Sequence, residues 1–159
     1  MTGAIGVTAK DMMVTSLRTV RADQRVSDAV KLLLKYSISG VPVIDEKHHL
    51  VGVISEKDCI RALMRAVHDR LPPSLVQDVM STDPITITED THLLTVAHHF
   101  LTKPIRRLPV VDNGRLVGQI SRRDLLRSAS RVFDIAPDRD TAVLYLSALE
   151  RRPPPSWQA

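Results

Sequence analysis

Apolar residues recur along the first part of the chain with a helical period and then with a strand period. Between Arg25 and Tyr36 they are spaced three and four apart, which predicts an amphipathic helix with Ser27 or Asp23 as its cap. Residues 40–45 and 50–54 are short apolar runs on either side of a polar turn. These two runs predict strands joined as a hairpin.

A second helical pattern follows the hairpin directly. Ser55 precedes the charged run 56–58 and is the natural N-cap, because its hydroxyl can accept from an amide of the first turn. The predicted helix runs to about Val67, and its apolar stripe consists of Ile60, Leu63 and Met64. The order of elements is therefore helix, strand, strand, helix.

The same order of elements occurs twice in the chain. A shift of 67 positions superposes Pro42-Val43-Ile44-Asp45 on Pro109-Val110-Val111-Asp112. With one residue fewer in the second turn, Leu50-Val51-Gly52 aligns with Leu116-Val117-Gly118. The chain is therefore an internal repeat, and the repeat decides the fold class.

One repeat alone is too small to bury both faces of its sheet. We therefore expect an α/β (α+β) fold of two units, residues 8–67 and 75–130, each a small sheet with two helices. The units are expected to pack sheet to sheet with pseudo-two-fold symmetry. Residues 131–159 fall outside the repeat, and they predict a helix over 138–152 followed by a Pro-rich tail that contains Trp157. That helix would pack on its own unit or contact a partner.

Composition and charge narrow the functional classes. Aromatic residues make up only 3% of the chain, which disfavours stacking on single-stranded nucleic acid. The net charge is +4 with both signs interspersed, which is typical of a solvated surface. Cys59 is the only cysteine, so an intramolecular disulfide is impossible and the thiol is expected to be a buried small hydrophobe.

No apolar run approaches the length that crosses a membrane, and the first residues lack the pattern of a signal peptide. We therefore expect a soluble cytoplasmic protein with no membrane contact.

Several motifs occur in the same order in both repeats. They are Asp-x-Met, a Thr-apolar strand (apolar-Thr-apolar in the second repeat, Arg18-Thr19-Val20 in the first), apolar-Pro-Val-apolar-Asp, and Leu-Val-Gly-x-Ile-Ser-x-x-Asp. This order resembles the CBS domain family, named for cystathionine β-synthase, and the pair resembles what that family calls a Bateman module. The resemblance implies two clefts between the units that hold AMP, ADP or ATP, or less often NAD or S-adenosylmethionine. It also implies a regulatory role and a homodimer.

The motif Gly-x-Ile-Ser-x-x-Asp has the clearest chemistry, and it ends at Asp58 in one repeat and at Asp124 in the other. A carboxylate on the first turn of a helix can accept from both ribose hydroxyls, and the serine hydroxyl and helix N–H groups can face a phosphate. In the family this aspartate does hold ribose. The same serine and aspartate could instead serve only as an N-cap and a helix-dipole partner. Duplication at matching positions favours the binding role.

The resemblance also places ligand contacts in the opposite unit, which gives two composite sites. The first site consists of Ser55, Asp58, Ile85, Thr86, Ile105, Arg106, Arg107 and Arg123. The second consists of Arg18, Thr19, Ile38, Ser39, Gly40, Lys57, Ser121 and Asp124.

The two sites differ in charge. Arg106 and Arg107 lie where related phosphate-binding units carry a basic pair, and guanidinium groups bind phosphate oxygens in a bidentate way. The first site is therefore expected to hold the phosphates, whereas the second is expected to be weaker, empty or suited to a less charged adenosyl ligand. The alternative is that these arginines form a solvated edge.

Catalytic and metal-binding constellations are missing from the sequence. The pairs His48-His49 and His98-His99 lack a cysteine or acidic partner at usable ligand spacing, so we expect no metal site. The sequence also lacks a Gly-rich phosphate loop and a nucleophile motif, so we expect a protein that is not an enzyme.

Three classes of function follow. The leading hypothesis is an adenine-nucleotide sensor that acts on an unknown regulated protein. The second is a ligand-independent interaction or stress scaffold with the same fold. Nucleic-acid binding through the basic edge ranks last. It predicts an affinity that falls steeply with salt and depends little on nucleotide identity.

Overall fold

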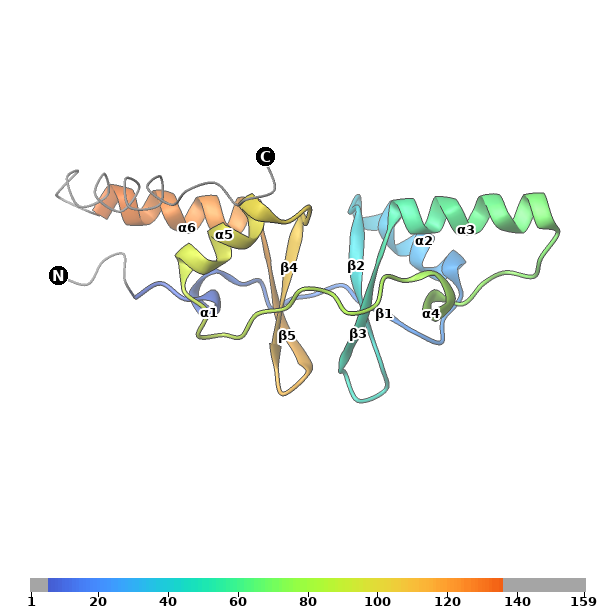
Figure 1. Ribbon diagram of the computed structural model, residues 1–159, viewed down its shortest axis with the longest axis horizontal. Coiled ribbons are helices and arrows are strands. Elements are labelled where there is room, and N and C mark those ends of the chain that lie inside the picture. The colour runs from blue at the N-terminus through green and yellow to red at the C-terminus, as the bar shows by residue number, and fades with distance from the viewer. Residues whose placement is uncertain (1–5, 136–159) are drawn as a thin grey trace, which may run out of the picture.

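The computed structural model of the protein describes residues 6–135. Two β-hairpins stand side by side at the centre of the molecule, and the helices lie on their outer sides (Figure 1). The predicted mixed α/β fold with two small sheets is confirmed. The helix expected over 138–152 and Trp157 lie outside the described residues.

The strands follow the repeat. In the first unit β1 (Val20–Arg21) pairs in parallel with β2 (Gly40–Ile44), which pairs antiparallel with β3 (Leu50–Ser55). In the second unit β4 (Arg107–Asp112) pairs antiparallel with β5 (Arg115–Ser121). The counterpart of β1 is reduced to a single parallel bridge between Ile87 and Val110.

Four longer helices cover the hairpins. They are α2 (Val26–Tyr36), α3 (Glu56–Asp69), α5 (Leu93–Thr102) and α6 (Arg122–Ile135). The Ser55 cap is confirmed, since its side chain accepts from the amide of Asp58. The cap expected for α2 is wrong: Arg25 occupies that position, Ser27 lies inside the helix, and Asp23 instead accepts from Arg21.

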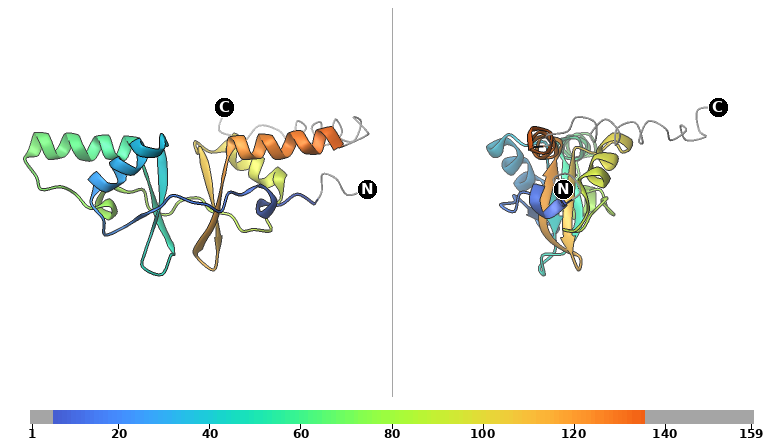
Figure 2. Two further views of the ribbon diagram at one scale, coloured as in Figure 1. Left: turned by 180° about the vertical axis from the view of Figure 1, so that it is seen from behind. Right: turned by 90° about the vertical axis from the view of Figure 1, so that its left-hand side faces the viewer.

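The first segment of each repeat packs against the other unit. The short helix α1 (Ala9–Met12) contributes Ala9 and Met12 to the core of the second unit, and α4 (Val76–Val79) contributes Val76 to the core of the first. Figures 1 and 2 show the chain crossing the molecule after each of these helices. The two units are thus joined by exchanged segments, and neither core is complete within one repeat.

Paired backbone hydrogen bonds hold each exchanged segment in place. Val14 exchanges two with Gln119 of β5, and Ser81 exchanges two with Val53 of β3. These pairs occupy equivalent positions of the two repeats. The hairpin turns add another equivalent pair, in which the amide of Leu50 donates to Gly114 at 3.0 Å and that of Leu116 donates to His48 at 3.1 Å.

The conserved spacing of glycine and methionine in the repeat has a packing reason. A Cβ added to Gly52 would lie 2.7 Å from both the sulfur of Met80 and the carbonyl oxygen of Ser81. A Cβ on Gly118 would overlap the side chain of Met13 in the same way. Each glycine therefore leaves room for the exchanged segment of the other repeat.

The apolar stripe of α3 does not face the core as a helical stripe ordinarily would. Its core-facing residues are Asp58, Cys59 and Ala62. Ile60 and Met64 are 61% and 63% exposed, and Leu63 and Val67 are exposed as well. The sequence pattern thus predicts the helix correctly, but the stripe lies on the surface of the chain.

Candidate functional site

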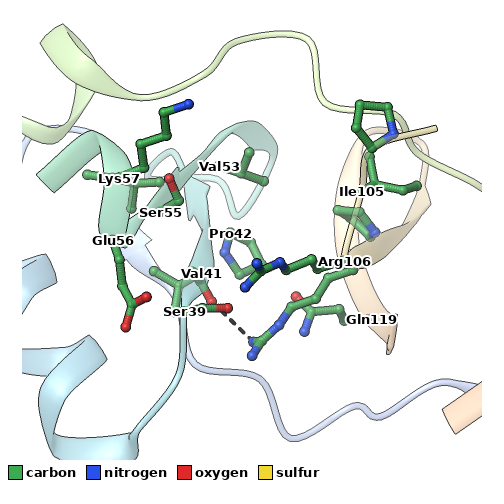
Figure 3. Close-up of a pocket in the computed structure, with 15 residues that line it drawn as sticks. Ser39, Val41, Pro42, Val53, Ser55, Glu56, Lys57, Ile105, Arg106 and Gln119 are labelled. Carbon is green, nitrogen blue, oxygen red and sulfur yellow. Dashed lines mark hydrogen bonds between the residues drawn. The ribbon is translucent and has the colours of Figure 1, made fainter. Parts of the chain in front are cut away.

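A cavity of about 480 Å³ lies between the two units, at the end of the hairpins where the strands adjoin the helices (Figure 3). The start of β2, the start of α3 and the segment before β4 form its walls. Because these segments come from both repeats, the cavity depends on the way the units are joined.

The cavity gathers residues from both predicted sites. From the first set it is lined by Ser55, Ile105, Arg106 and Arg107, and from the second by Ser39, Gly40 and Lys57. The other predicted residues are not among those that line it: Asp58, Ile85, Thr86, Arg123, Arg18, Thr19, Ile38, Ser121 and Asp124. Lys57 therefore lies on the same wall as Ser55, and the two arginines project from the facing unit.

Ser55 and Asp58 bond to each other at the start of α3. Oδ2 of Asp58 accepts from the amide of Ser55 at 2.9 Å and from its hydroxyl at 2.6 Å. The amide of Asp58 in turn donates to the Ser55 hydroxyl. The pair is thus a reciprocal cap, and Asp58 is only 8% exposed.

The second copy of the motif has the same arrangement. Ser121 donates to Oδ2 of Asp124 through its amide at 2.8 Å and its hydroxyl at 2.6 Å. The remaining carboxylate oxygens lie 3.5 Å from Arg61 and 3.4 Å from Arg127, each one turn further along the helix. In both repeats the capping interpretation of the motif is therefore realised, and one oxygen of each carboxylate faces an arginine.

The basic groups of the cavity differ in how they are held. Nη1 of Arg107 donates to the carbonyl oxygen of Gly40 at 3.1 Å, across the boundary between the units (Figure 3). Arg106 extends from the second unit toward the first, and Lys57 projects from the opposite wall. Arg106 and Lys57 are both exposed, so they are accessible to an anion in the cavity.

Arg18, predicted for the second site, stacks on an aromatic ring. Its guanidinium carbon lies 4.1 Å from the ring centroid of Tyr36, a cation–π contact at the end of α2. Arg18 therefore contacts Tyr36, and neither residue lines the cavity.

Glu56 and Gln119 line the cavity but were missed by sequence reasoning. The repeat alignment contains a signal for both of them. Glu56 corresponds to Arg122, and Gln119 to Val53, so each position changes in polarity or charge between repeats. Such differences within an otherwise matched motif mark where the two halves of the cavity diverge.

The metal-ligating residue types of the described residues do not gather at one place. Within residues 6–135 no three His, Cys, Asp or Glu side chains lie close enough to hold a metal ion. Cys59 is buried. Burial is the main reason why the pKa of its thiol is raised, and the negative charge of Asp58 raises it further. A raised pKa keeps the thiol protonated and weakens it as a nucleophile.

Among the helices of residues 6–135, none combines the length and the apolar character that a membrane span requires.

The fold and the cavity define a class of protein, the pseudo-symmetric pair of α/β units with a composite cavity between them. The family model of the CBS domain matches residues 9–65 and 76–131. The chain therefore belongs to the CBS domain family and carries a tandem pair of these domains, as the sequence resemblance indicated.

Two solved structures carry the comparison further. The crystal structure of CBSX2 in complex with AMP is 33% identical, covers 80% of this chain and 98% of that one, and has a TM-score of 0.71. The CBS domain pair of protein MJ0100, in complex with 5′-methylthioadenosine and S-adenosyl-L-methionine, is 28% identical with a TM-score of 0.65. It covers 78% of this chain and 96% of that one.

Curated relatives are longer than the matched region. Chloroplastic CBSX2 of Arabidopsis thaliana is 29% identical over 80% of this chain and 65% of its own length. Inosine-5′-monophosphate dehydrogenase of Methanocaldococcus jannaschii is 33% identical over 75% of this chain but only 23% of its own length. The chain thus spans about a quarter to two thirds of these relatives.

Proposed function

We propose that this CBS pair is a regulatory sensor that binds an adenine nucleotide, AMP, ADP or ATP, in the cavity between its units. The observation that carries the proposal is the convergence of Arg106, Arg107 and Lys57 on one cavity built from both repeats. Guanidinium and ammonium groups are the usual partners of phosphate oxygens. The complexes of CBSX2 with AMP and of MJ0100 with two adenosyl ligands support the choice of ligand class.

The proposed output is regulatory rather than catalytic. A ligand that contacts both units stabilises one relative pose of the two, and it can change the affinity for a partner that reads this pose. We propose that the sensor acts in the cytoplasm on a regulated protein as a homodimer. The exposed stripe of Ile60, Leu63, Met64 and Val67 on α3 supports this assembly, because a second copy would remove it from water.

A ligand-independent scaffold is the second candidate. The observation in its favour is that Ser55 and Ser121 already donate their hydroxyls to Asp58 and Asp124. Both motifs that the family uses for ribose and phosphate are thus satisfied within the chain. A scaffold requires only the fold, so it predicts no effect of any adenosyl ligand on stability.

Thermal unfolding of the full chain with AMP, ADP, ATP, NAD or S-adenosylmethionine separates the two candidates. A ligand present at a hundred times its Kd adds about 2.7 kcal/mol to the free energy of unfolding. The variant Arg106→Gln should lose most of this gain for phosphate-bearing ligands. Arg115→Gln is the matched control, since it removes the same charge at the far end of the β4–β5 hairpin. No shift with any ligand would favour the scaffold.

A further inference from the structure

Glu56 is an acidic residue in the wall of an otherwise basic cavity. It is the first residue of α3, and its amide donates to the carbonyl oxygen of Ser39 at 3.0 Å, which fixes the start of the helix against the cavity wall. In Figure 3 its side chain points to the Ser39 side, whereas the side chain of Lys57 points to the opposite side. Among the ion pairs of the described residues, none includes Glu56.

The cations that oppose this carboxylate are few. Arg106, Arg107 and Lys57 bring three positive charges to the cavity, because the bond from Arg107 to the neutral carbonyl group of Gly40 leaves the guanidinium charge in place. AMP carries about two negative charges near neutral pH, and each further phosphate adds about one more. Three cations less the carboxylate of Glu56 leave a net charge of +2, which matches a monophosphate. Longer phosphate chains exceed this charge, and the carboxylate repels the excess.

We infer that Glu56 sets the ligand preference of the cavity, favouring a nucleoside monophosphate over the di- and triphosphate. Repulsion between the carboxylate and the ligand grows with the number of negative charges on the ligand. The inference rests on the proposed function, because it concerns the same cavity and deepens the choice among AMP, ADP and ATP.

The second repeat indicates that the fold does not need an acid at this position. The equivalent residue is Arg122, whose guanidinium donates to the carbonyl oxygen of Ile105 at 3.0 Å. The backbone role of Glu56, its amide bond to Ser39, is independent of the side-chain charge. Glu56→Gln is therefore expected to fold as the wild type does.

The test is calorimetric titration of the full chain with adenosine, AMP, ADP and ATP, in EDTA so that no divalent cation neutralises the phosphates. The wild type should bind AMP more tightly than ATP. Glu56→Gln should tighten ATP binding on the order of fivefold or more, ADP less, AMP least and adenosine not at all, since the effect scales with ligand charge.

Asp69→Asn is the matched control. It removes the same charge from the other end of the 14-residue helix, about 20 Å away, so it should leave all four affinities in their wild-type ratio. An equal effect of Glu56→Gln on all four ligands, no effect, or a wild type that prefers ATP would overturn the inference while leaving nucleotide binding intact. A wild type that binds none of the four ligands would contradict the proposed function as well.

Discussion

Arg107 and Gly40 occupy the same position in the two repeats, and they are hydrogen bonded to each other. Nη1 of Arg107 donates to the carbonyl oxygen of Gly40 at 3.1 Å. Two equivalent residues can touch only close to the pseudo-two-fold axis, so this bond ties the units together at their centre. It also breaks the symmetry, because Gly40 has no side chain with which to return the bond.

Replacing Arg107 tests the contribution of this tie. Arg107→Met keeps much of the aliphatic stem and removes the donor, and we expect the free energy of unfolding to fall by about 1 kcal/mol. The guanidinium is only partly buried, so a larger loss is not expected. Urea denaturation measures the change. Arg106→Met is the control, since Arg106 is exposed, and it should be nearly neutral; equal losses in both variants would show that the bond adds nothing.

The glycine–methionine contacts give a second prediction. Gly52→Ala places a Cβ 2.7 Å from the carbonyl oxygen of Ser81, which belongs to the backbone and cannot rotate away. We expect a loss of about 2–3 kcal/mol in the free energy of unfolding, at the upper end for an overpacked core.

Gly118→Ala should be milder and, in part, rescued. Its nearest neighbours are side-chain atoms of Met13, so the methionine can change rotamer. Combining Gly118→Ala with Met13→Ala should recover part of the loss, measured as a coupling energy in a double-mutant cycle. A purely additive cycle would contradict the explanation of the repeat spacing by close packing.

These contacts show what the sequence could and could not predict. The helix and strand periods are local, so the hairpin over 40–54, the helix after it and the Ser55 cap follow directly from the pattern. The exchange of α1 and α4 between units leaves no local trace, because Asp-x-Met has the same pattern whichever core it joins. The contact between Met13 and Gly118 is the feature that reveals the exchange. A repeat alignment cannot predict this contact, because it does not show whether a methionine packs on the glycine of its own repeat or on that of the other.

The residue types of the cavity could be predicted from the sequence, but the contacts of their side chains could not. The charges of Arg106 and Arg107 are visible in the sequence, and the resemblance implied that these residues lie opposite Ser55. In the structure all three line one cavity. The bonds that Asp58 and Arg18 make with their neighbours depend on side-chain rotamers. The sequence pattern also did not predict which face of α3 is buried. The buried face carries the small residues Cys59 and Ala62, and the larger apolar residues lie on the exposed face.

The pH dependence of stability should depend on Asp45 at the first hairpin turn. Its carboxylate accepts from the amides of His49 and Lys47 and contacts the His49 ring. The bond from the His49 amide is the main cause of a pKa below the ordinary value for an aspartate. A carboxyl whose pKa is lower in the folded chain stabilises it above the unfolded pKa, and this stabilisation is lost as the pH falls through the folded value.

Asp45→Asn should therefore destabilise the chain at pH 7 and have a smaller effect below the ordinary aspartate pKa of about 3.9. Denaturation curves between about pH 6 and pH 2 measure the difference between variant and wild type. Asp112→Asn alters the equivalent residue of the second hairpin and is the control. A difference that stays constant over the whole range would contradict the role assigned to the Asp45 charge.

The exposed stripe of α3 provides the test of assembly. Ile60, Leu63, Met64 and Val67 follow one another at helical spacing, and all are exposed in the single chain. If a second copy covers them, Met64→Glu places a charge in an apolar contact, and the population should shift toward monomer. Light scattering coupled to size exclusion reports the mass of each variant. The free energy of unfolding of the monomer should barely change, because Met64 is 63% exposed there.

Leu101→Glu separates assembly from a general effect of surface charge. Leu101 is 85% exposed at the end of α5, outside the stripe, and its substitution should leave the mass unchanged. A wild type that is monomeric at high concentration would contradict the dimer, and so would a Met64→Glu variant that keeps the mass of a wild-type dimer. The helix α3 begins at the cavity, and its exposed stripe starts about one turn later. If the helix links the two sites, adding AMP to the wild type should also shift the monomer–dimer equilibrium.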